Sequence, residues 1–485
     1  MTLKDKIVSD TLFATVIKIG EKARGILFIP LITLYLGANA YGVYAQLIVV
    51  TRLLAGTFEL GLHSAVIRYF QSYDYVSERR ELYVDVLGFI LVLSTLVAGG
   101  MFVFAERISQ LTLNDATYAD VYRLGALLIP INSALIIAEN YYRAKRRIKS
   151  YSLLNGLKTY LSMVAVGYVV LFQSGTLTDL VLYLVLTELS FFLLIQGDVF
   201  RHLGVQFPRF RTIPKSLRYS LPVMAGQISG NFLTRADRLL LGYFIGPFAV
   251  GAYTVAYKFA NQILLFSRPL SNSFFPEFSN LWENNKREDA RSYLHAGTRY
   301  FLTLAVPSVV GFTLVGERLI ALISTSEVAS EGGLALPIIA IGVSFWGLTH
   351  LYSCLYYAAE LTKPVSYIRI IGAGVNILLN VLLIPIFGLV GAAVTTAVSY
   401  FCIFTVMWWY SRNMLGMDNR RYRIHKIGFA SIGMYSVVST SGFDGLLIVI
   451  PLAVVCYFLV LFLIGGLTRS EIESLVRPIR SVWAS

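Results

Sequence analysis

Short polar connections divide the chain into fourteen long apolar stretches. A stretch of about 20 apolar residues is long enough to cross the ~30 Å hydrocarbon core of a bilayer as a helix. Backbone polar groups must be paired within lipid, so stretches of this length favour helices. We therefore predict an all-α polytopic membrane protein with fourteen transmembrane helices, the thirteenth being short and rich in serine. The predicted spans are residues 11–36, 41–69, 82–104, 118–140, 151–173, 178–197, 217–243, 248–275, 292–315, 334–358, 365–386, 388–411, 426–441 and 445–466.

The composition excludes a soluble globular domain and a disordered chain. Of the 485 residues, 56% are hydrophobic and 14% are charged, and the mean hydropathy is +0.66. Soluble domains average about 45–50% apolar and about 25% charged residues. The first ten residues are polar and of mixed charge, which does not fit a cleavable signal peptide. Cys354, Cys402 and Cys456 each lie within an apolar stretch and are expected to be small buried side chains.

The net charge of +13 indicates how the chain is oriented in the membrane and does not indicate nucleic-acid binding. With the N-terminus in the cytoplasm, 26 of the 41 basic residues fall in inner segments, and only Arg107 and Arg318 fall in outer loops. Cytoplasmic loops of membrane proteins carry an excess of Lys and Arg. We therefore predict a multi-pass protein of the cell (inner, cytoplasmic) membrane with both termini in the cytoplasm. The remaining thirteen basic residues lie within or at the edges of the spans, where charges are costly and usually functional.

The connections are too short to hold a catalytic or nucleotide-binding domain. None exceeds about 20 residues, and the chain carries no GxxxxGK[ST] motif. We predict that the protein is not an enzyme and uses no cofactor and no metal centre.

A short motif occurs twice. GxxAxGxY begins at Gly37 after the first predicted span and again at Gly246 after the seventh. Because both copies follow the first helix of a six-helix half, they indicate a parallel repeat about an axis along the membrane normal, as in transporters whose site lies between two lobes. The predicted parts are an N-terminal lobe (1–205), a C-terminal lobe (206–412), and helices thirteen and fourteen with the tail (413–485).

Three segments resemble the polysaccharide-transporter family, which includes the O-antigen-type flippases of the multidrug/oligosaccharidyl-lipid/polysaccharide (MOP) exporter superfamily. They are the stretch from Ala236 to Lys258, the segment from Ile384 to Ala393, and the turn from Leu36 to Tyr44. The resemblance implies two pseudo-symmetric six-helix lobes plus two C-terminal helices. It also implies transport of a polyprenyl-pyrophosphate-linked oligosaccharide from the inner to the outer leaflet by alternating access. Surface polysaccharides such as lipopolysaccharide depend on this step, so polymerase and glycosyltransferase enzymes are expected partners.

Two alternatives belong to the same superfamily. The chain resembles lipid II flippases in its number of helices and in its basic residues on the first, second and eighth spans. A cation or multidrug exporter is the other alternative, although basic residues outnumber acidic ones within the spans. A polytopic polymerase or ligase is a third hypothesis, but such enzymes commonly carry a longer outer loop.

Helical spacing places the intramembrane polar residues on stripes. At about 100° per residue, the second span brings Arg52, Glu59 and His63 within an arc of about 40°. The stripes on the first, second, seventh and eighth spans would converge between the lobes, where guanidinium groups bind phosphate and amide or tyrosine side chains bind sugars. The predicted substrate-binding residues are Lys18, Arg24, Arg52, Arg235, Arg238, Tyr257, Asn261 and Arg268. The predicted coupling residues are Glu21, Glu59 and His63.

Each of these residues also has a structural interpretation. Basic residues near span ends, including Arg68, Lys158 and Arg369, favour snorkelling to the interface. Arg235 and Arg238 could equally pair with Asp237 in a structural network. Proton coupling, sodium coupling and the membrane potential all remain open as the driving force.

Overall fold

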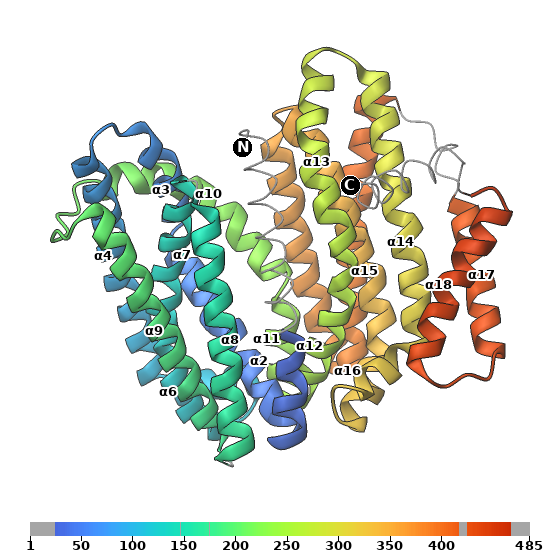
Figure 1. Ribbon diagram of the computed structural model, residues 1–485, viewed down its shortest axis with the longest axis horizontal. Helices are drawn as coiled ribbons and strands as arrows, with labels where there is room; N and C mark the ends of the chain where they lie inside the picture. The colour runs from blue at the N-terminus through green and yellow to red at the C-terminus, as the bar shows by residue number, and fades with distance from the viewer. Residues whose placement is uncertain (1–24, 146, 174, 417–423, 467–485) are drawn as a thin grey trace, which may run out of the picture. The chain divides into compact units, whose positions relative to one another are not determined.

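The computed structural model describes residues 25–145, 147–173, 175–416 and 424–466, and these residues form helices and no strand (Figure 1). Nine of the described helices are long and apolar enough to cross a membrane. The all-α membrane fold is therefore confirmed, and the count of fourteen spans stays a prediction. The helices are Gly25–Tyr35, α2 (Ala38–Phe58), α3 (Leu62–Ser72), α4 (Val76–Val103), α5 (Ala105–Leu113), η1 (Ala116–Tyr118), α6 (Ala119–Ala126), α7 (Leu128–Ala144), α8 (Ile148–Phe172), α9 (Leu177–Leu203), α10 (Ile213–Leu233), α11 (Ala236–Phe244), α12 (Pro247–Ala260), η2 (Asn261–Ile263), α13 (Leu264–Glu283), α14 (Arg287–Ala321), α15 (Ser326–Ala358), α16 (Thr362–Leu415), α17 (Ile424–Thr440) and α18 (Leu446–Leu463).

The chain divides into two compact units. Unit 1 holds the described residues through Thr254, with Ile323–Val328 and Ile377–Leu389. Within it, α7 packs against α3 and α4, α8 packs against α9, and α10 packs against α3. Unit 2 holds the described residues of Val255–Leu322, Ala329–Asn376 and the chain from Val390 onward. Here α13 packs against α14, and α17 lies beside both α14 and α18 (Figure 1).

The 54-residue α16 is interrupted at Gly388. Gly388 has φ 56° and ψ −131°, outside the helical region. Glycine adopts positive φ at little cost, which explains the residue type at this position. The interruption falls at the boundary predicted between the spans 365–386 and 388–411.

The two GxxAxGxY turns pack directly on one another within unit 1. A Cβ on Gly42, in the first turn, would lie 1.7 Å from the carbonyl oxygen of Pro247, in the second. A Cβ on Gly251 would lie 3.1 Å from the carbonyl oxygen of Ala38. Small residues let helix backbones approach this closely inside a membrane. The repeat therefore marks a contact between the start of α2 and the start of α12.

A buried carboxylate holds the connection between α9 and α10. Asp85 on α4 is fully buried. It accepts hydrogen bonds from the backbone N–H groups of Arg209 (2.7 Å), Phe210 (2.9 Å) and Thr212 (3.0 Å), and from the Thr212 hydroxyl (3.1 Å). A buried carboxylate is tolerated when such hydrogen bonds satisfy it. Asp85 thus fixes the segment that leads into α10.

Candidate functional site

The predicted site residues fall into three groups. Lys18, Glu21 and Arg24 lie outside the described residues. Unit 1 contains Arg52, Glu59, His63, Arg235 and Arg238, and unit 2 contains Tyr257, Asn261 and Arg268.

Glu59 and His63 form a pair at an interruption between α2 and α3. Leu60 and Gly61 have positive φ values of 55° and 68°, which end one helix and start the next. Glu59 is 3% exposed, and its Oε1 lies 3.0 Å from the backbone N and 2.5 Å from the Nδ1 of His63. The predicted common arc of these two residues corresponds to a direct contact in the structure.

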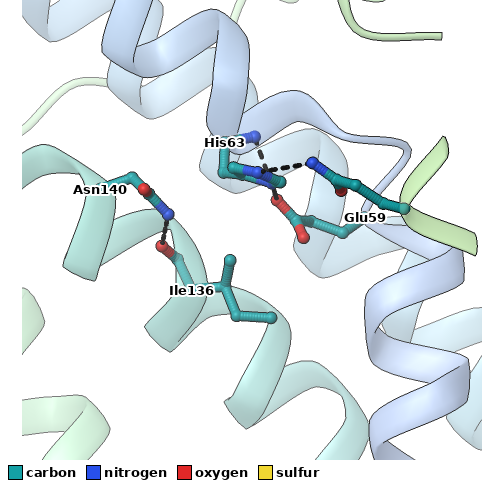
Figure 2. A network of polar contacts seen from close by, with 5 residues as sticks. Glu59, His63, Ile136 and Asn140 are labelled. Carbon is teal, nitrogen blue, oxygen red and sulfur yellow. Dashed lines mark hydrogen bonds and ion pairs between the residues drawn. The ribbon is translucent and has the colours of Figure 1, made fainter. Parts of the chain in front are cut away.

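A third residue extends this pair to α10. The Gln227 Nε2 lies 3.2 Å from the His63 Nε2, and Figure 2 shows the pair together with Asn140 of α7. The Asn140 side chain donates to the Ile136 carbonyl at 2.8 Å. When the neutral imidazole donates from Nδ1 to Glu59, its Nε2 accepts from the Gln227 amide. A proton on Nε2 would turn that nitrogen into a donor, so the Gln227 amide would have to rotate and accept.

Arg52 lies in the middle of α2 and is exposed. It makes no hydrogen bond or ion pair with any other residue of the described ranges. A guanidinium at this position in an apolar helix is costly in lipid and usually faces water or a ligand.

A second interruption carries Arg235. The helix α10 ends at Leu233, and Arg235 precedes the first residue of α11. Arg235 is partly exposed and donates a hydrogen bond to the Asn231 side chain. This position leaves the guanidinium at a helix break, the type of irregular backbone that lines binding sites in transporters.

The contacts of Arg238 differ from those of Arg235. It is 8% exposed, its Nη1 donates to the Thr234 carbonyl at 3.1 Å, and its guanidinium lies 5.8 Å from the Tyr253 ring centroid. Asp237 accepts from the Arg238 backbone N–H at 2.9 Å and from the Tyr253 hydroxyl at 2.6 Å. Arg238 therefore takes part in a buried network, while Arg235 is the more accessible of the two arginines.

The third interruption lies in unit 2. Between α12 and α13, Asn261 begins the 3₁₀ turn Asn261–Ile263. The Tyr257 hydroxyl lies 3.3 Å from the Tyr400 hydroxyl, and Arg268 is exposed one turn beyond the break, followed by Pro269. No carboxylate of the described residues lies within ion-pair distance of Arg268.

Hydropathy does not predict any of the three interruptions. A hydropathy window measures length and apolarity, and both persist across a break. Gly61 is a visible signal for the first break, whereas no glycine or proline marks the start of the break at Asn261. Lys158, for which we expected snorkelling to the interface, has its Nζ 3.1 Å from Glu188 on the neighbouring helix.

The sequence is similar to those of known polysaccharide-biosynthesis proteins and flippases. A family model described as polysaccharide biosynthesis protein matches residues 34–330, and one described as lipid II flippase MurJ matches residues 200–465. "Probable low-salt glycan biosynthesis flippase Agl15" of Haloferax volcanii is 23% identical over 92% of this chain and 91% of its own length. "Probable flippase AglR" of the same organism is 34% identical, but the alignment spans only 34% of either protein.

Solved structures extend the agreement to the whole fold. The lipid II flippase MurJ in an inward closed conformation superposes with a TM-score of 0.80 at 15% identity, covering 96% of this chain and 99% of that one. An inward-facing multidrug transporter of the MOP superfamily gives a TM-score of 0.64 at 13% identity, covering 83% and 94%. Because each family model matches more than half of the sequence, the chain belongs to the family described as polysaccharide biosynthesis proteins, and it also matches the model of the lipid II flippases.

Proposed function

We propose that this protein is a flippase that moves a polyprenyl-pyrophosphate-linked oligosaccharide from the inner to the outer leaflet for surface polysaccharide export. The observation that carries the proposal is the pair of exposed guanidinium groups, Arg52 and Arg268, on apolar helices. No carboxylate of the described residues neutralises either one. Such groups match an anionic ligand better than a cationic drug.

The chemistry of the cargo suits these side chains. Guanidinium groups form bidentate hydrogen bonds with phosphate oxygens, and we propose Arg52 and Arg235 in unit 1 and Arg268 in unit 2 as phosphate-binding residues. Asn261 and Tyr257 supply hydrogen bonds to sugar hydroxyls, and the lipid tail stays in the bilayer. Lys18, Arg24 and Arg238 remain further candidates for the same role. We further propose that transport proceeds by alternating access of two lobes, residues 1–205 and 206–412. Residues 413–485 are not part of either lobe.

We propose that the protein lies in the inner (cytoplasmic) membrane of the cell with both termini in the cytoplasm. The basic connection after α7 supports this placement, because positive charge is concentrated there. Burial lowers the pKa of Lys145, and the neighbouring Arg147 and Arg79 guanidinium groups lower it further. We propose glycosyltransferases and a polymerase as functional partners, and a transport role without enzymatic activity.

Charge removal at Arg52 or Arg268 tests the binding assignment. In proteoliposomes carrying a labelled polyprenyl-pyrophosphate oligosaccharide, Arg52→Gln and Arg268→Gln should each slow the appearance of label in the outer leaflet by about 10–100-fold. This is the effect of losing one charge-assisted hydrogen bond of about 1.5–3 kcal/mol. Arg68→Gln is the matched control, since Arg68 lies on α3 with its guanidinium 5.1 Å from the Tyr219 ring centroid. Equal rates for all three variants and the parent would refute the assignment.

Coupling is proposed to run through Glu59 and His63, with Glu21 as a further candidate and H⁺ or Na⁺ as the ion. Protonation of the His63 Nε2 would reverse the direction of its hydrogen bond with the Gln227 amide. We expect Glu59→Gln, which removes the carboxylate in contact with His63, to flatten the dependence of the transport rate on pH, measured in vesicles of defined internal and external pH. Glu106→Gln, at an exposed ion pair with Arg123, should keep the parental profile. A parental profile for Glu59→Gln would remove this residue from the coupling mechanism.

Lipid II transport is the second candidate function. The match of residues 200–465 to the lipid II flippase model favours it. Supplying lipid II and a polyprenyl-pyrophosphate oligosaccharide separately in the same vesicle assay distinguishes the two, because they share the pyrophosphate and differ in the sugar.

A further inference from the structure

Unit 2 contains basic side chains that extend the proposed site beyond Arg268. Arg369 on α16 and Arg268 on α13 both act electrostatically on the His350 imidazole of α15. The three residues come from three different helices, so the fold brings them together. Arg369 is partly buried.

An aromatic platform fixes this group. The Trp346 ring stacks on Tyr400 with centroids 5.0 Å apart and an interplanar angle of 25°, and its centroid lies 5.3 Å from that of His350. The Arg369 guanidinium lies 5.7 Å from the Trp346 centroid. Trp346 is 9% exposed and Tyr400 is fully buried, so the platform is part of the packed interior.

The partners of Arg369 are neutral. Its Nη2 lies 3.3 Å from the Ser353 hydroxyl oxygen, and Ser353 shares one face of α15 with Trp346 and His350 at a spacing of three and four residues. Cation–π contacts and hydroxyl groups orient a guanidinium without cancelling its charge. Its Nε is buried and has no hydrogen-bond partner among the described residues.

No counter-charge accompanies these cations within the described part of unit 2. The 54 residues of α16 contain no Asp or Glu, and the acidic residues of α15 lie at its first turns, Glu327 and Glu331. No described carboxylate lies within ion-pair distance of Arg369 or Arg268. Uncompensated charges in a membrane span are costly, which favours a site that an anion completes.

We infer that Arg268, His350 and Arg369 form a lipid-phosphate subsite in unit 2, which binds the pyrophosphate headgroup of the transported lipid. Trp346 and Ser353 act as positioning residues that hold Arg369 in place. Arg268 and Arg369 donate to phosphate oxygens, and His350 donates one further N–H. The assignment of the headgroup rests on the proposed function, whereas the phosphate chemistry follows from the side chains themselves.

The test measures binding rather than transport. The purified full-length protein in detergent is titrated with a short-chain polyprenyl pyrophosphate and, separately, with phosphatidylglycerol. Arg369→Gln should weaken binding of the polyprenyl pyrophosphate by at least about tenfold, the loss expected for one charge-assisted hydrogen bond, and Arg369→Lys should weaken it less. Arg412→Gln is the matched control, because Arg412 lies on the same helix with its guanidinium 5.9 Å from the Trp408 ring centroid.

The outcomes separate this inference from the proposed function. Parental affinity in a folded Arg369→Gln variant, judged by an unchanged unfolding midpoint, would overturn the subsite whether or not the protein transports lipid. Arg369-dependent binding without flipping in vesicles would support the subsite and refute the flippase proposal. Equal, Arg369-dependent binding of phosphatidylglycerol would assign the subsite to ordinary phospholipid and overturn its assignment to the transported headgroup.

Discussion

Gly42→Ala is expected to destabilise the protein strongly, and by more than a methyl group added at Gly251 or Gly99. The new Cβ would lie 1.7 Å from the Pro247 oxygen and 2.5 Å from the Pro247 carbonyl carbon. Both are backbone atoms, so relief requires the starts of α2 and α12 to separate. Overpacking of this kind typically costs about 1–3 kcal/mol or more. Thermal unfolding of the detergent-purified protein should show a clearly lowered midpoint.

Two further variants make this prediction specific. Gly251→Ala should have a smaller effect, because its Cβ would meet Ala38 and Gly42 at 3.1–3.3 Å. Gly99→Ala in α4 is the control, since nothing lies within 4 Å of the position that its new methyl group would take and alanine favours helix. If Gly42→Ala and Gly99→Ala unfold at the same temperature, the packed contact between the two repeats is wrong.

Asp85→Ala is expected to release the segment between α9 and α10. Its carboxylate accepts three backbone N–H groups and one hydroxyl, and alanine leaves them without their acceptor. Unsatisfied buried groups cost about 1–3 kcal/mol each, so we expect a loss of about 3 kcal/mol or more in the free energy of unfolding. Asp85→Asn keeps one acceptor oxygen and should fall between the parent and Asp85→Ala.

Limited proteolysis gives a local measurement of the same effect. Trypsin cleaves after Arg209 and Arg211, which lie in the segment that Asp85 holds. Cleavage there should be faster in Asp85→Ala than in the parent. Asp120→Ala, at an exposed ion pair with Arg123, should leave it unchanged. Parental cleavage in Asp85→Ala would show that the segment is held by other contacts.

The sequence predicted those features that depend on one helix at a time. Length and apolarity were enough for the helical membrane fold. The spacing of Glu59 and His63 also placed them together, although a break separates α2 from α3 between them. The motif at Gly37 and Gly246 marked two turns of similar sequence. It did not indicate that the turns touch, because that contact depends on tertiary packing.

Features that depend on several helices could not be predicted. The position of Arg369 near a span end favoured the prediction that its side chain snorkels. The sequence does not reveal that Trp346 and Ser353 of another helix lie beside it. The predicted stripe on the seventh span assumed that Arg235 and Arg238 lie on one continuous helix. The break before α11 alters that geometry and leaves the two arginines in different surroundings.

The most direct test of the proposed function is a flipping assay with the parent protein. Proteoliposomes and protein-free vesicles receive a labelled polyprenyl-pyrophosphate oligosaccharide or a cationic dye, and label crossing the bilayer is followed over time. We expect protein-dependent exposure of the lipid-linked oligosaccharide in the opposite leaflet and no protein-dependent movement of the dye. Movement of the dye without exposure of the oligosaccharide would contradict the flippase proposal and indicate a cation exporter.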